Sequence, residues 1–128
     1  MINFKIMQRV NLQNPLEPRK HYAYIQNQGV VNLRQIAKRI SRESTISMMD
    51  IMAVLEGLLQ VIPDLLLEGN IVRLGELGTF RSTISSEGVD IADDFNFSHI
   101  KHLNLIFRPG SEFSDQLNSV KFKKVSEN

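Results

Sequence analysis

The apolar stretch between Ser47 and Gly69 constrains the fold of this chain more than any other feature. Large apolar side chains surround more than one face of a helix there, at Ile51, Met52, Leu55, Leu58, Leu59, Ile62, Leu65 and Leu66. A helix that packs on one small neighbour needs a narrower apolar stripe. The width of this stripe therefore predicts burial on two sides, which the association of two copies of the chain provides.

Capping signals bracket this helix and a shorter helix before it. Ser47 can cap the N-terminus of the long helix, and Gly69-Asn70 is a helix-ending signal. Asn32 can cap the shorter helix, whose apolar side chains share one face at Leu33, Ile36, Ala37 and Ile40. Pro63 should kink the long helix, because proline has no N–H to donate.

Strand patterns flank the two helices on both sides. Alternating polar and apolar residues predict an N-terminal antiparallel hairpin and three later strands, and a short last helix should hold Phe113, Leu117 and Val120 inward. The expected strands cover residues 2–10, 21–25, 71–74, 79–85 and 99–107. The order ββ-αα-βββ-α predicts an α+β fold, and a monomer of this size could not bury so much apolar surface.

Composition excludes several classes of protein. The 128 residues suit a single domain, and a hydrophobic fraction of 42% argues against disorder. There is no cysteine, which excludes disulfides, thiol nucleophiles and metal sites built on cysteine. The richest apolar run contains charged residues and a proline, and the N-terminal residues lack the apolar core of a signal peptide. We therefore expect a cytoplasmic protein with no membrane span.

Charge is distributed unevenly along the chain. Eight cationic and two acidic side chains lie in residues 1–47, so this part carries +6 and the remainder −5 of a total of +1. A basic segment on a nearly neutral chain favours a local anionic partner. An ordinary solvated surface explains the same pattern, and this observation alone leaves both interpretations open.

No group of residues predicts catalysis. His99 and His102 are too close within a strand to share one face, so we expect no metal pair there. Ser85-Ser86 lacks the context of a nucleophile elbow, and Gly75-x-x-Gly78 lacks the spacing and the lysine of a phosphate loop. We expect no enzymatic activity, no cofactor, no metal and no small-molecule substrate.

Two motifs resemble those of the bacterial histone-like HU and integration-host-factor family. Residues 69–80, GNIVRLGELGTF, are similar to the family's helix-end glycine and first sheet hairpin. Residues 106–110, IFRPG, resemble the segment that leads the last strand into the final helix. The segment between them has roughly the length of the family's β-ribbon arm. The hairpin in residues 1–31 resembles an extension in a divergent HU-like branch of gut-type Bacteroidetes.

This resemblance implies one HU-like domain over residues 1–128. Its parts would be the N-terminal hairpin at 1–31 and a core at 32–122, with two helices, a three-stranded antiparallel sheet, a C-terminal helix and an arm at about 82–102. In this family two chains intertwine into a homodimer whose arms reach round DNA and bend it, as HU-type architectural proteins do. We expect a nucleoid-associated protein that binds duplex DNA with little sequence preference.

Cations supply the candidate DNA-binding residues. Each could contact a phosphate group, and each could equally be a solvated surface cation. They lie on the sheet, in the C-terminal tail and on the first helix: Arg73, Arg81, Lys101 and Arg108; Lys121, Lys123 and Lys124; Lys38, Arg39 and Arg42.

The arm departs from the family pattern. The tripeptide R-N-P of the family's arm tip is absent, and Thr83 and Ser85 stand where the family has arginines. Four carboxylates, Glu87, Asp90, Asp93 and Asp94, would repel phosphates. Ile91, Phe95 and Phe97 are available as wedges, but we expect them to fill a folded-back arm. The alternative function is therefore a protein-interaction or scaffold module that has lost arm-mediated DNA binding.

Overall fold

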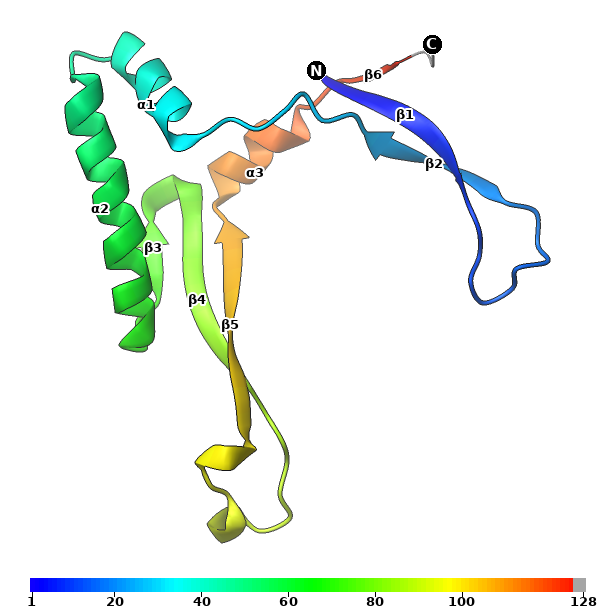
Figure 1. Cartoon of the computed structure of the whole chain (residues 1–128), viewed down its shortest axis with the longest axis vertical. Coiled ribbons are helices and arrows are strands. Elements are labelled where there is room, and N and C mark those ends of the chain that lie inside the picture. The colour runs from blue at the N-terminus through cyan, green and yellow to red at the C-terminus, as the bar shows by residue number, and fades with distance from the viewer. Residues whose placement is uncertain (126–128) are drawn as a thin grey trace. The chain divides into compact units, whose positions relative to one another are not determined.

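The computed structural model describes residues 1–125, and the chain divides into two compact units (Figure 1). One unit spans Val31–Asp115, and the other joins Met1–Val30 to the segment from Gln116 onward. The predicted order of helices and strands is confirmed, with one short strand added near the end.

The unit that contains the N-terminal residues is built on a three-stranded sheet. β1 (Ile2–Arg9) pairs with β2 (Lys20–Ile25) as the predicted antiparallel hairpin. β6 (Phe122–Lys124) lies parallel to β1 on its other side, so the strand order is β2-β1-β6. Lys123 and Lys124, which the sequence placed in a basic C-terminal tail, therefore belong to β6.

The second unit begins with two helices, α1 (Leu33–Arg42) and α2 (Met48–Leu67), whose predicted caps are confirmed. The Asn32 side chain accepts from the Gln35 N–H, and the Gln35 side chain accepts from the Asn32 N–H, both at 2.9 Å. Ser47 Oγ accepts from the backbone N–H three residues later at 3.2 Å. Gly69 follows the end of α2 with a φ of +86°, where a side chain would add strain. α2 continues through Pro63.

An antiparallel sheet of order β3-β4-β5 follows the helices. β3 (Val72–Leu74) is short, whereas β4 (Gly78–Ser86) and β5 (Ile100–Pro109) pair along their whole length. The β4–β5 ribbon therefore extends beyond β3 and α2 as an arm (Figure 1). α3 (Ser111–Asn118) comes after β5, and it ends before Val120, which the sequence placed inside it.

Two glycines of the recognised motifs fix the end of β5 against the turn before β4. Gly78 has a φ of +150°, and a Cβ there would lie 2.5 Å from the Arg108 carbonyl oxygen. The Gly110 N–H donates to the Leu77 carbonyl at 3.2 Å, and a Cβ on Gly110 would overlap the carbonyl of Glu76. Only glycine at both positions allows this close approach.

The tip of the arm is held by local hydrogen bonds around two short 3-10 helices, Ala92–Asp94 and Phe97–His99. The Asn96 N–H donates to His99 Nδ1 at 3.1 Å, and Asn96 Oδ1 accepts from the Ser98 N–H at 2.9 Å. Apolar side chains at the tip stay exposed, Phe97 at 92%. The expected folded-back arm is therefore wrong, because Ile91 and Phe97 stay exposed while hydrogen bonds at Asn96 order the tip.

Very little of the described chain is buried. Ala37 and Ile51 are the buried hydrophobic side chains, and no polar side chain is buried. Leu59, in the middle of α2, is 59% exposed. Two buried side chains cannot offset the conformational entropy lost on folding a domain of this size.

Candidate functional site

The central sheet has one apolar and one polar face, as its pairing register shows. Residues paired across antiparallel strands point to the same side, and side chains alternate along each strand. Phe80 pairs with both Val72 and Phe107, and the Phe80 and Phe107 rings lie 4.8 Å apart. α2 contacts β3 and β4, where Val72, Leu74 and Phe80 are half-buried. The apolar face is therefore the one that α2 covers in part.

Three predicted cations gather on the opposite, polar face. Arg73 pairs with Thr79, and Thr79 pairs with Arg108. The two arginines are therefore the ends of one row of residues across the three strands, with Thr79 between them. Arg81 lies two residues farther along β4 on the same face. Strand spacing places the Cα atoms of Arg73 and Arg108 about 10 Å apart, with Arg81 about 7 Å from Thr79. All three side chains are exposed, and we name them the arginine cluster.

Lys101 lies apart from the arginine cluster. Ser85 pairs with His102 and Ser86 with Ile100, so Lys101 is the extra residue of a β-bulge near the tip. It stands five residues along β5 from Ile106, the partner of Arg81, which is about 17 Å of strand. The structure therefore does not bring Lys101 to the arginines, although its side chain is exposed.

Charge changes sign along the polar face of the ribbon. Beyond Arg81 come Thr83 paired with Asn104 and Ser85 paired with His102, and Asn104 Nδ2 donates to Ser85 Oγ at 2.8 Å. The four carboxylates follow at the tip: Glu87, Asp90, Asp93 and Asp94. Within residues 1–125 the one ion pair joins Arg39 and Glu43, so no cation of this part neutralises the tip directly.

The cations predicted on the first helix lie close together on α1. Lys38, Arg39 and Arg42 line a shallow depression of about 500 Å³ with Val31, Gln35 and Glu43. Arg39 Nε is 3.6 Å from Glu43 Oε1, with both side chains largely exposed. An exposed ion pair of this kind contributes little to the free energy of folding. An anion can therefore replace Glu43 as the partner of Arg39 with little loss of stability.

The three C-terminal lysines lie in the unit that holds the N-terminal sheet. Lys123 and Lys124 are in β6, and the carbonyl of Lys121 accepts from the Ile2 N–H at 2.8 Å. The arginine cluster belongs to the other unit. Sequence reasoning assigned no role to Lys5, Arg9 and Lys20 of the same sheet, although their two-residue spacing from Met7 and Tyr22 is visible in the sequence.

No group of three or more His, Asp or Glu side chains in residues 1–125 is placed to hold a metal ion. None of the helices in this range is long and apolar enough to cross a membrane.

Comparisons with known proteins agree with this fold. A family model described as an HU domain fused to a wHTH, Ig or glycine-rich motif matches residues 1–124. A solved structure of a candidate bacterial DNA-binding protein from Bacteroides vulgatus is similar, with a TM-score of 0.68 at 10% sequence identity. The similarity covers 99% of this chain and 49% of that chain, so the present chain spans about half of its length. No curated protein matches the chain.

Proposed function

The chain belongs to the family of HU domains fused to a wHTH, Ig or glycine-rich motif, and we propose on this premise that it binds duplex DNA through the arginine cluster. The observation that carries the proposal is the gathering of Arg73, Arg81 and Arg108 on the exposed face of the central sheet. The strands β3, β4 and β5 contain no carboxylate that would oppose phosphates there.

The chemistry of the cluster favours binding with little sequence preference. Exposed guanidinium groups on a sheet can reach the phosphates, and phosphate contacts carry no direct sequence information. Neutralising a phosphate releases condensed counterions, so the affinity should fall steeply as salt rises. The family membership and the likeness to a candidate DNA-binding protein support this reading, and they suit a histone-like protein of the bacterial nucleoid.

We further propose that the DNA-binding form is an intertwined homodimer. One chain leaves the apolar side of α2 open, with Leu59 59% and Val54 65% exposed. The apolar face of β4 and β5 is open as well, with Leu103 53% exposed and Leu105 63%. A second copy would cover these surfaces, because both chains carry the same pair of apolar faces.

A second function, a protein-interaction module, is favoured by the tip of the arm. Ile91, Phe95 and Phe97 are 60%, 41% and 92% exposed, and four carboxylates surround them in sequence. Apolar side chains within an acidic segment suit a protein partner better than the minor groove of DNA. Bending of the duplex by the arms depends on which of the two partners the tip contacts.

Titration of a labelled duplex at two salt concentrations tests the DNA-binding proposal. Replacing Arg73, Arg81 and Arg108 together by Ala should weaken binding about equally across sequences. The slope of log affinity against log salt should become shallower by about 2.7 for each chain in contact. A triple change of the α1 cations, Lys38, Arg39 and Arg42, to Gln removes the same charge elsewhere and should have the smaller effect. An unchanged slope in the first variant would contradict the proposed interface.

A further inference from the structure

The N-terminal sheet also has two unlike faces. On one face Phe4 pairs with Ile25 and Ile2 with Phe122, and the rings of Phe4 and Phe122 meet edge to face at 6.5 Å. This face is mostly apolar, and its polar members are Lys124, which pairs with Phe4, and the pair Gln8 and His21. The other face holds the residues that alternate with these along each strand, so its side chains can have a different character.

Two tyrosines occupy the centre of the second face. Tyr22 pairs with Met7 and Tyr24 pairs with Lys5, and the two rings lie on one strand two residues apart. Side chains at this spacing repeat every 7 Å or so along a strand. Tyr22 is 45% exposed, Tyr24 39% and Met7 51%. The rings therefore present a stepped aromatic surface to solvent.

Cations stand at both ends of the tyrosine pair. Arg9 pairs with Lys20 next to Tyr22, and Lys5 lies beside Tyr24. Lys123 of β6 pairs with Asn3 on the same face. The strands β1, β2 and β6 contain no carboxylate, so this face is uniformly positive. We name it the tyrosine face, formed by Lys5, Met7, Arg9, Lys20, Tyr22, Tyr24 and Lys123.

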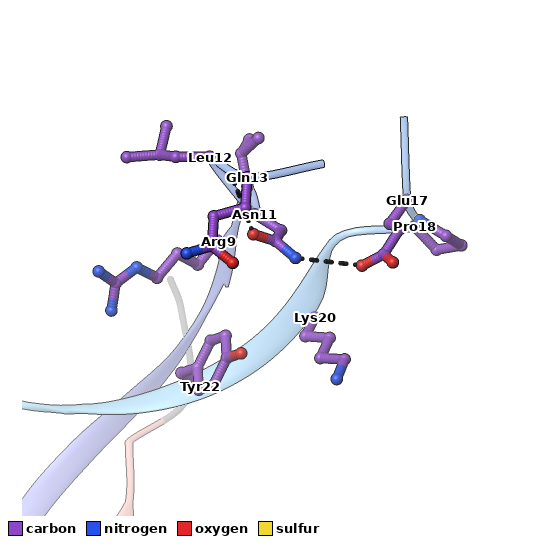
Figure 2. A pocket seen from close by; sticks show the side chains of 9 residues that line it. Arg9, Asn11, Leu12, Gln13, Glu17, Pro18, Lys20 and Tyr22 are labelled. Carbon is purple, nitrogen blue, oxygen red and sulfur yellow. Dashed lines mark hydrogen bonds between the residues drawn. The ribbon is translucent and has the colours of Figure 1, made fainter. Parts of the chain in front are cut away.

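A hollow at the loop end of the tyrosine face is large enough for a nucleotide. Arg9, Lys20 and Tyr22 surround it with residues of the β1–β2 loop, and its volume is about 400 Å³ (Figure 2). Its one carboxylate, Glu17, accepts hydrogen bonds from Asn11 Nδ2 at 3.1 Å and from Asn14 Nδ2 at 3.2 Å. Glu17 is thus engaged by amides and forms no ion pair with Arg9 or Lys20.

We propose that the tyrosine face binds a single strand of nucleic acid, with unpaired bases stacked on Tyr22 and Tyr24 and phosphates held by the flanking cations. Exposed aromatic rings inside a basic surface are what unpaired bases require, because each base offers a π-face for stacking. A duplex keeps its bases paired and offers this surface phosphates alone. An acidic peptide would satisfy the cations and leave both rings unused. The site lies in a different unit from the arginine cluster and goes beyond the proposed duplex binding.

The two tyrosines supply a direct test, because they are the only tyrosines of the chain and it has no tryptophan. Adding oligothymidylate to the full-length protein should quench the tyrosine fluorescence as the bases stack. Heparin, a polyanion without bases, should bind and leave the emission unchanged. A duplex of equal length should quench far less than the single strand. Equal quenching by heparin or duplex would overturn the inference.

Paired variants separate stacking from charge. Tyr22→Leu should weaken binding of a labelled oligothymidylate by about fivefold or more, whereas Tyr22→Phe keeps the ring and should retain the affinity. Lys5→Gln should weaken it more than Arg34→Gln, which removes one charge from α1. Unchanged affinity in Tyr22→Leu and Tyr24→Leu would overturn the inference.

Duplex binding is measured in the same samples. Duplex binding without quenching by the single strand contradicts the tyrosine face and leaves the arginine cluster standing. Quenching without duplex binding contradicts the arginine cluster alone.

Discussion

The two ends of the β4–β5 ribbon carry opposite charge. Where the ribbon joins β3, the three strands together hold the arginine cluster and contain no carboxylate. At its tip, residues 87–99 hold four carboxylates and neither lysine nor arginine. A polyanion is attracted to one end of this structure and repelled at the other. The shape of a β-ribbon arm therefore does not by itself predict DNA binding, because the charges on the arm decide whether phosphates are attracted or repelled.

The two ends also differ in how their apolar side chains are held. Leu59 on α2 and Phe97 at the tip are both exposed in one chain. Leu59 continues an apolar surface that runs along the helix and the sheet, whereas Phe97 stands among polar neighbours. The same degree of exposure thus leads to opposite expectations, burial in a dimer for Leu59 and continued exposure for Phe97.

The largest expected effect is that of Leu59→Glu. In a homodimer it buries a charge without a partner and should lower the free energy of unfolding by several kcal/mol, enough to unfold the protein at micromolar concentration. Urea unfolding followed by circular dichroism, with sedimentation equilibrium, measures this. Phe97→Glu is the control and should change stability by no more than about 0.5 kcal/mol. A stable, folded monomer in the wild type would remove the contrast between the two regions.

An intermediate effect is expected from the two capping boxes, one in each region. Asn32 caps α1 and Asn96 caps the 3-10 helix at the tip, each with a side chain that accepts from a backbone N–H, of Gln35 or of Ser98. In both, the side chain three residues after the cap accepts from the N–H of the cap residue. Asn32→Ala should lower the global free energy of unfolding by about 1 kcal/mol. Asn96→Ala should speed hydrogen exchange at the tip and leave the global value unchanged. If Asn32→Ala and Asn96→Ala lowered the global free energy of unfolding by the same amount, the tip would unfold together with the rest of its unit.

The smallest expected effect comes from neutralising the tip. Changing Glu87, Asp90, Asp93 and Asp94 to their amides should tighten duplex binding less than about threefold at low salt, and not at all once salt screens the repulsion. The melting temperature should stay the same, because within residues 1–125 these carboxylates form no ion pair. A lower melting temperature would reveal partners for them in the dimer.

Local signals in the sequence predicted most of this fold. The caps at Asn32 and Ser47 and the glycine at Gly69 set the helix ends through contacts within four residues, so they can be read from the sequence directly. β6 could not be predicted, because three residues pair with a strand far away in sequence and locally resemble a charged tail. The tip was predicted wrongly because three apolar residues suggested packing, while hydrogen bonds at Asn96 hold it exposed.

The residues of the candidate site were predicted from the sequence, but which of them lie close together was predicted only in part. Arg73, Arg81 and Arg108 share a face because the register of the three strands aligns them. The glycines of the two sequence motifs indicated this sheet before its register was known. Lys101 was grouped with them by its place on the returning strand, and the bulge that sets it apart leaves no sequence signal. The tyrosine face went unrecognised, because its cations look like ordinary surface residues until β1, β2 and β6 are paired.

The parallel pairing of β1 with β6 has a consequence for biosynthesis. Ile2 pairs with Phe122, so the N-terminal strand leaves the ribosome long before its partner exists. At the usual rate of translation the delay is about 6 to 24 seconds, much longer than the microseconds in which a hairpin forms. The β1–β2 hairpin must wait, exposing the edge of β1 that β6 later covers, while α1, α2 and the central sheet are synthesised. Pairings between residues so distant in sequence form slowly, which makes this small sheet the expected last step of folding.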